Sequence, residues 1–225
     1  MSQNENAPVI TVDGPSGAGK GTLTGLLTAA LSWNFLDSGA IYRVTAIAAR
    51  QRGVSLDDIA GLVDVGLHLN VVFKNDPKQT RILLDSKDIT HEVRLETTGN
   101  LASKIAPITE LRDALLNRQR QFRQAPGLIA DGRDMGTVVF PDADIKFYLT
   151  ASPEERAKRR YLQLKEKGVD VSIARLADEI KERDDRDMNR EVAPLRPADD
   201  AIILDSSDLS IEEVFKKVMT YVRKL

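Results

Sequence analysis

The chain has 225 residues, of which 42% are hydrophobic and 29% charged, and its formal net charge is −2. This length and composition suit one large α/β domain, or a core with small inserts, and they argue against wholesale disorder. The small net charge argues against a global basic field for nucleic acid or anionic membrane. Cysteine is absent and there are two histidines, which excludes disulfide frameworks and Cys-based zinc sites and leaves little for a Ser-His-Asp hydrolase.

The N-terminal segment, residues 1–8, is polar and lacks the basic start and apolar core of a signal peptide. No apolar run approaches the ~18–20 residues that span a bilayer. We therefore expect a soluble cytoplasmic protein, by default a monomer, with neither a nucleic-acid polymer nor a membrane as partner. The lack of cysteine is consistent with a reducing compartment.

The first quarter of the chain predicts two strand-to-helix units. Residues 9–12 form a short β-branched run that the glycine-rich stretch 13–19 ends. Leucine and alanine then recur at helical spacing over 23–31. A second short strand is predicted at 35–37, followed by a helix from Ile41 to near Gly53.

The stretch from about residue 54 to 105 has a different pattern. A short helix is predicted around 59–63, and two β-like runs, 69–73 and 81–85, flank the turn-rich residues 75–79. We interpret this stretch as a small antiparallel insert. The alternative is that both strands join the main sheet.

The next segments return to alternating strands and helices. A helix is predicted from Leu111 to about Arg123, and buried strands are predicted at 127–131 and 145–149. Residues 152–155 then read Ser-Pro-Glu-Glu, which supplies an N-cap serine, a proline at the first helical position and a capping-box glutamate.

The last segment begins with a very highly charged stretch, residues 156–191, which Gly168 divides into two helical pieces. A strand at 201–204 and a helix capped by Ser210 and Glu213 follow. The alternation of strands and helices along the chain predicts a mostly parallel sheet covered on both faces.

The most informative segment runs from residue 14 to 22 and reads G-x-x-x-x-G-K-G-T between a predicted strand and a predicted helix. Glycines let successive N–H groups point at one anion, the following helix adds its positive end, and Lys20 can reach the β- and γ-phosphates of a nucleotide. The alternative is a glycine-rich turn with a solvated lysine. Gly21 stands where Ser or Thr usually follows the lysine, so Thr22 is a less certain Mg²⁺ ligand than Lys20 is a phosphate ligand. The predicted ATP-binding residues are Gly14, Pro15, Ser16, Gly17, Ala18, Gly19, Lys20, Gly21 and Thr22.

A phosphate loop does not separate a motor, a switch and a small-molecule kinase. The chain has no Asn-Lys-x-Asp, which disfavours a guanine-specific GTPase. Phosphoryl transfer between two small molecules needs many anionic oxygens held together without water, and this calls for arginines from several places. The rival hypotheses are a P-loop kinase with another acceptor, and a nucleotide-binding switch.

Arginines and aspartates recur where such a site would need them. Arg43 follows Asp37-Ser38-Gly39 at the end of the second strand, and residues 131–136, Asp-Gly-Arg-Asp-Met-Gly, follow a buried strand. By position Asp131 could order Mg²⁺ through water, although a salt bridge or a turn cap is at least as good an interpretation.

The charged helices carry a second set of arginines. Spacings of four and three predict that one face of the second helix carries Arg183, Asp187 and Arg190. The preceding helix carries a cluster of three arginines, Arg156, Arg159 and Arg160. As a set these residues indicate a lid that closes over phosphates. The alternative is a solvated helix pair joined by i,i+4 ion pairs.

Four segments carry a family resemblance: DGPSGAGKGT at 13–22, LDSGAIYR at 36–43, IADGRDMGTVVFP at 129–141 and KERDDRD at 181–187. With these segments the chain resembles bacterial cytidylate kinases, members of the nucleoside monophosphate kinases. The first segment is shared with adenylate kinases, and the second and third are more specific.

The resemblance implies an α/β fold: a P-loop NTPase-like three-layer core with a five-stranded parallel sheet, a small antiparallel insert that binds the nucleoside monophosphate, and a short helical lid. The implied boundaries are 1–60, 105–153 and 192–225 for the core, 61–104 for the insert and 154–191 for the lid. The implied reaction converts ATP and CMP (or dCMP) to ADP and CDP (or dCDP), with Mg²⁺.

The resemblance also implies residue roles. Arg43, Arg133 and Arg190 would hold the CMP phosphate, Arg183 and Asp187 would contact the sugar, and Ser103, Arg112 and Asp134 would read cytosine, with Ser38 nearby. Asp37 and Tyr42 complete the candidate substrate-binding set, and the candidate catalytic residues are Lys20, Arg133, Arg159 and Arg190. The base assignment is physically reasonable, because a carboxylate accepts from cytosine N4 and would repel the O4 of uracil.

Overall fold

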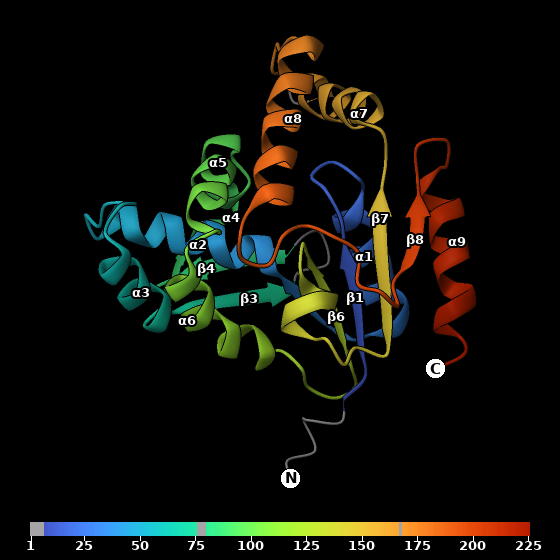
Figure 1. Cartoon of the computed structure of the whole chain (residues 1–225), viewed down its shortest axis with the longest axis horizontal. Coiled ribbons are helices and arrows are strands. Elements are labelled where there is room, and N and C mark those ends of the chain that lie inside the picture. The colour runs from blue at the N-terminus through green and yellow to red at the C-terminus, as the bar shows by residue number, and fades with distance from the viewer. Residues whose placement is uncertain (1–6, 76–79, 167) are drawn as a thin grey trace. The chain divides into compact units, whose positions relative to one another are not determined.

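The computed structural model describes residues 7–75, 80–166 and 168–225 (Figure 1). The chain divides into two compact units, one formed by the residues up to Leu36 and from Arg120 to Leu225, the other by Asp37–Gln119. Residues 76–79 of the predicted turn and most of the polar N-terminal segment lie outside the described residues.

The first unit is built on a five-stranded parallel sheet with the order β2-β6-β1-β7-β8. Strand β1 lies at its centre, and in register Val12 faces Asp131 on one side and Phe147 on the other. The strands are β1 Val9–Asp13, β2 Asn34–Asp37, β6 Leu128–Gly132, β7 Ile145–Thr150 and β8 Ile202–Asp205. The sheet confirms the predicted fold class.

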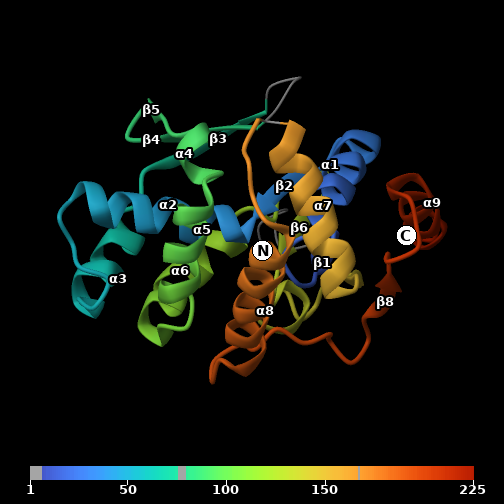
Figure 2. The same cartoon turned by 90° about the horizontal axis from the view of Figure 1, so that it is seen from above.

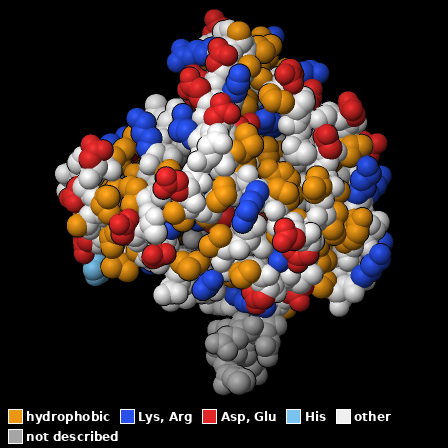
Figure 3. All heavy atoms as spheres, in the orientation of Figure 1, with side chains coloured by type: hydrophobic (Ala, Val, Ile, Leu, Met, Phe, Trp, Pro, Cys, Tyr) orange, Lys and Arg blue, Asp and Glu red, His pale blue; other side chains and the backbone are white. Residues whose placement is uncertain are grey.

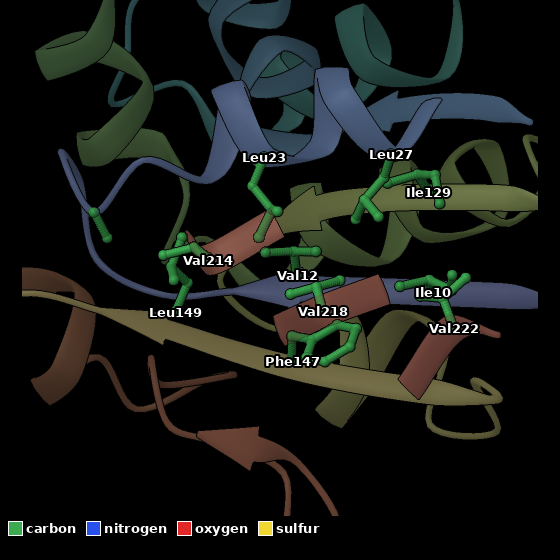
Figure 4. Close-up of a cluster of buried hydrophobic side chains, with 11 residues drawn as sticks. Ile10, Val12, Leu23, Leu27, Ile129, Phe147, Leu149, Val214, Val218 and Val222 are labelled. Atoms are coloured by element: carbon green, nitrogen blue, oxygen red, sulfur yellow. The ribbon is translucent and has the colours of Figure 1, made fainter. Parts of the chain in front are cut away.

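Two helices cover one face of this sheet. Side chains alternate along a strand, so Ile10 and Val12 of β1 point to the same face. There they pack against α1, Lys20–Leu31, and α9, Ile211–Val222, and the buried cluster includes Leu23 and Val218 (Figure 4). The capping box of Ser210 and Glu213 forms as predicted.

The opposite face of β1 carries a short π-helix, η1, Met135–Val139. A Cβ on Gly136 would lie 2.9 Å from Oγ1 of Thr11, and Thr11 alternates with Ile10 and Val12. The sequence pattern gave no sign of this helix. It places the backbone that follows Asp134 directly against the central strand.

The charged stretch forms two helices, α7 Pro153–Glu166 and α8 Ile173–Asn189, which pack side by side (Figures 1 and 2). The predicted N-cap is present, because Ser152 Oγ accepts from the backbone N–H of Glu155 at 3.2 Å. One prediction is wrong. Arg190 does not share a helix face with Arg183 and Asp187, because α8 ends at Asn189 and Arg190 is extended, with φ −66° and ψ 140°.

The second unit has its own hydrophobic core, in which Val44, Ile47, Val65 and Leu84 are buried. Its antiparallel sheet has the order β3-β4-β5, which confirms the small insert sheet and excludes the alternative that these strands join the main sheet. The sequence pattern did not indicate α4 or α5. The elements are α2 Ser38–Gln51, α3 Ile59–Leu67, β3 Val71–Asn75, β4 Thr80–Leu84, β5 Lys87–Asp88, α4 Thr90–Val93, α5 Glu96–Ile105 and α6 Thr109–Arg120.

Basic and acidic side chains are interspersed over the face drawn in Figure 3, as the net charge of −2 suggests. Within the described ranges, none of the helices has the length and apolar character needed to cross a membrane.

Candidate active site

The phosphate-loop segment forms a tight turn between β1 and α1. Gly14 has φ +148°, and a Cβ there would lie 2.0 Å from the carbonyl oxygen of Leu149, so only glycine fits. Gly19 is the N-cap of α1 with φ +97° and makes no side-chain capping bond. The N-terminal N–H groups of α1 are therefore not covered by a side chain from the N-cap, as an anion-binding helix end requires.

Lys20 is buried at the start of α1, with 7% of its surface exposed. Its Nζ donates to the carbonyl oxygen of Pro15 at 3.0 Å and lies 3.9 Å from Oδ1 of Asp131. Burial, assisted by the Arg133 guanidinium and opposed by Asp131, lowers the pKa of Lys20 to about 8. The fold thus keeps an ammonium group inside the loop at a cost in solvation.

Arg133 is paired with a carboxylate from α8. Its Nε donates to Oδ2 of Asp187 at 2.8 Å. Burial by itself lowers the pKa of Arg133, but the charge and hydrogen bond of Asp187 outweigh burial and raise it. Burial would likewise raise the pKa of Asp187, yet Arg133, followed by Arg183 and Arg190, holds it below its usual range. The structure therefore brings together Lys20, Arg133, Arg183 and Asp187.

Arg190 and Asp134 form a second buried pair. Nη2 of Arg190 lies 3.5 Å from Oδ1 of Asp134, and each side chain is 4% exposed. Arg190 also donates to the carbonyl oxygen of Ala193. Although Arg190 lies outside the helix face predicted for it, its guanidinium still reaches the turn that carries Arg133 and Asp134.

Two arginines of α7 bond to the phosphate loop and to the residue that follows the last strand, whereas Arg160 donates to Gln163 of its own helix. Arg156 donates to the carbonyl oxygen of Ser16 at 3.0 Å and pairs with Asp184 of α8 at 2.5 Å. Arg159 donates to both the hydroxyl and the carbonyl oxygen of Ser206, at 3.1 and 2.6 Å. Sequence reasoning placed Arg156 only in a cluster, since no local pattern indicates partners 140 and 28 residues away.

The second unit positions the remaining candidates. Asp37 caps α2, accepting from the N–H of Ala40 at 2.8 Å, and Ser38 and Ser103 are buried. Arg43 donates to the carbonyl oxygen of Val93 at 2.7 Å.

Two further candidates of this unit lie against each other. The guanidinium carbon of Arg112 is 5.8 Å from the ring centroid of Tyr42, a distance within cation–π range. Arg112 also donates to the carbonyl oxygen of Ala106 at 3.1 Å. Tyr42 and Arg112 are both buried, so one aromatic ring and one cation share a fixed geometry.

The oxygen donors near Lys20 suit Mg²⁺ that arrives with a nucleotide better than a metal held by protein alone. No cluster of three or more His, Asp or Glu in the described part of the chain could hold a metal ion. Mg²⁺ is commonly bound by one or two protein oxygens together with phosphates and water. Asp131, at the end of β6, and the exposed Thr22, in the first turn of α1, are oxygen donors of that kind.

A family model and individual relatives among known proteins both match this chain, and they carry the same description. The family model described as cytidylate kinase matches residues 10–224. A cytidylate kinase of Aeromonas hydrophila is 58% identical over 218 residues, covering 97% of this chain and 95% of the relative. One from Pectobacterium carotovorum is 57% identical over 219 residues, covering 97% of each chain. The similarity extends over both units.

Proposed function

Because this chain belongs to the cytidylate kinase family, we propose that it transfers the γ-phosphoryl group of ATP to CMP or dCMP. The bond between the γ-phosphorus and the bridging oxygen breaks, ADP leaves with that electron pair, and a phosphate oxygen of the acceptor bonds to the γ-phosphorus. One observation carries the proposal: in a chain of this family, the ammonium group of Lys20 is buried where the loop between β1 and α1 enters the helix.

The phosphate loop binds the donor in this proposal. The N–H groups at the start of α1 and the Nζ of Lys20 contact the β- and γ-phosphates, where charge redistributes during transfer. When bound with ATP, Mg²⁺ neutralises part of that charge, and Asp131 and Thr22 are the protein oxygens proposed to face it. Arg159 and Arg190 are proposed to add positive charge around the moving group.

The acceptor site is proposed to combine a phosphate end and a base end. Arg43, Arg133 and Arg190 hold the phosphate, and Arg183 and Asp187 contact the sugar. Arginine forks suit this task because they bind phosphate oxygens through two parallel hydrogen bonds. No general base is required, since the phosphate of CMP is already ionised near neutral pH.

At the base end, the carboxylate of Asp134 accepts from the exocyclic amino group of cytosine. Ser103 and Arg112 are proposed to read the base together with Asp134, and Ser38 lies near them in this proposal. Asp37 and Tyr42 complete the proposed substrate-binding set. Uracil presents an oxygen in place of the amino group, so we expect discrimination of about 1–3 kcal/mol from this contact.

The division of labour along the chain is part of the proposal. Residues 61–104 act as the monophosphate-binding insert and 154–191 as a lid, whose closure excludes water from the transferring group. We also propose that the enzyme is a cytoplasmic monomer whose substrates are small nucleotides, with neither a nucleic-acid polymer nor a membrane as partner. Sedimentation with and without substrates would test the oligomeric state.

Turnover assays with ATP, Mg²⁺ and one of CMP, dCMP, UMP or AMP test this function. We expect phosphorylation of CMP and dCMP, and a kcat/KM for UMP lower by roughly 5–150-fold. ATP hydrolysis that is indifferent to every monophosphate would instead favour a nucleotide switch. Equal kcat/KM for CMP and UMP would contradict the assignment of Asp134.

A further inference from the structure

Asp13 is a buried carboxylate that has no part in the mechanism above. It is the last residue of the central strand β1, faces Gly132 of β6 and Tyr148 of β7 in register, and is 4% exposed. Burial raises its pKa to about 7, although two backbone hydrogen bonds oppose the rise. A group that is costly to ionise in the fold calls for an explanation other than stability.

Both carboxylate oxygens of Asp13 are used on one short segment. Oδ1 accepts from the N–H of Met135 and Oδ2 from the N–H of Gly136, each at 2.8 Å. These are the first two N–H groups of η1, which have no partner inside the helix. A carboxylate from a strand 122 residues earlier thus satisfies the start of this helix.

One of these two N–H groups, that of Gly136, is one that Asp134, the N-cap of η1, would ordinarily satisfy. An N-cap aspartate usually accepts from the N–H groups two or three positions ahead. Here Asp134 makes no side-chain capping bond. Its main-chain carbonyl accepts from Val138 and Val139, while its carboxylate lies near Arg190. Asp13 therefore supplies the side-chain acceptor at the start of η1, and Asp134 supplies the main-chain acceptor.

The turn is packed so closely that a small shift would be felt. A Cβ on Gly136 would lie 2.9 Å from Oγ1 of Thr11 and 3.1 Å from Cδ of Lys146. The backbone at 135–136 is consequently held between the carboxylate of Asp13 and the side chains of Thr11 and Lys146.

We propose that Asp13 is a positioning residue for recognition of the acceptor base: its carboxylate caps η1 in place of Asp134 and so keeps the carboxylate of Asp134 directed at the amino group of cytosine. This inference rests on the proposed function and deepens it. Asp13 touches no substrate in this account, and it acts on base recognition through Asp134. Its charge also favours the charged form of Lys20, so the readout is the ratio for the two acceptors rather than turnover alone.

The test is Asp13→Asn, scored by the ratio of kcat/KM for CMP to that for UMP. An amide offers one acceptor and one donor, so one of the two N–H groups would face another N–H group and the turn would shift. We expect the ratio to fall about tenfold, with KM for CMP raised more than kcat is lowered.

Asp144→Asn is the matched control. Like Asp13, Asp144 has a carboxylate that accepts from a main-chain N–H, here that of Val9 at 2.7 Å, but it lies at the other end of β1. This variant should keep the wild-type ratio. A purely structural role for Asp13 would lower the melting temperature and leave the ratio unchanged in folded protein, which would overturn the proposal.

A double-variant cycle tests the route of the effect. If Asp13 acts through Asp134, then Asp13→Asn should change the ratio much less in an Asp134→Asn background than in the wild type. If the two variants changed the ratio by independent factors that multiply in the double variant, the proposal would be overturned. Should Asp13→Asn not fold, Asp13→Ser, whose hydroxyl can satisfy one N–H, is measured in its place with the same expected outcome. A wild-type protein that does not prefer CMP would refute the proposed function itself rather than the role of Asp13.

Discussion

The phosphate loop holds a buried cation, Lys20, and the turn at residues 131–136 holds a half-buried one, Arg133, and the two are compensated differently. In the loop, Lys20 donates to a main-chain carbonyl and its nearby carboxylate, Asp131, stays 3.9 Å away. In the turn, Arg133 bonds a carboxylate, that of Asp187, at 2.8 Å. Burial lowers the pKa of Lys20 to about 8, whereas pairing outweighs burial and raises the pKa of Arg133.

The difference indicates that the charge of Lys20 is left for a bound anion, whereas the charge of Arg133 is paired within the protein and helps to hold α8 in place. The loop keeps an under-compensated ammonium, which an incoming polyphosphate would stabilise further. The turn has its charge neutralised by α8, so the pair also fixes the helix at the carboxyl end of β6. A buried pair of this kind is worth little net stability, but losing one partner is costly.

Removing the carboxylate of the turn should have the largest effect. Asp187→Ala leaves the half-buried Arg133 without that partner, and we expect the free energy of unfolding to fall by roughly 3–5 kcal/mol. Denaturant titration measures this. Glu179→Ala is the control on the same helix, because it removes an exposed pair with Arg175 at 2.9 Å and should cost less than about 0.5 kcal/mol. Equal losses would show that α8 is not anchored through this pair.

Removing the cation of the loop should instead raise the stability of the protein. Lys20→Met eliminates a poorly compensated buried charge, so the melting temperature at pH 7 should rise while kcat falls by roughly 10²–10³-fold. Calorimetry and a turnover assay on the same preparation check both halves. Near-normal turnover would refute the charge-stabilisation account, and a lower melting temperature would refute the contrast with Arg133.

A smaller effect is expected in the pH dependence of stability. The pKa of Lys20 is about 8 in the folded protein against an ordinary value of 10.5, so between these values the folded state binds fewer protons at this group than the unfolded state. Its contribution to the unfolding free energy therefore rises with pH from about 8 to 10.5. The stability advantage of Lys20→Met over the wild type should shrink across that window in denaturant titrations. An advantage independent of pH would contradict the shift.

Local sequence signals predicted much of the fold. The β-branched run at 9–12, the glycine-rich loop and the helix after it all formed, as did the capping box of Ser210 and Glu213. Each depends on residues within a few positions of one another, where propensity, capping and loop chemistry act directly. The insert sheet was predicted on the same grounds.

Contacts between distant segments were not predictable in this way. Arg190 was assigned to a helix face by spacing alone, and the helix ends one residue before it. The π-helix η1 and the partners of Arg156 left no periodic trace in the sequence. Such contacts depend on which strand ends and helices meet after folding, and a single sequence does not state those distances.

The amino-acid sequence by itself determined that a strand would run into a phosphate-binding turn and a helix, because that motif is complete within about fourteen consecutive residues. Only the tertiary structure decided which carboxylate would neutralise Arg133 and which would cap η1. Asp13, Asp134 and Asp187 are the same residue type, and their different tasks arise from where β1, β6 and α8 converge, since burial and proximity across the fold give each carboxylate its partner.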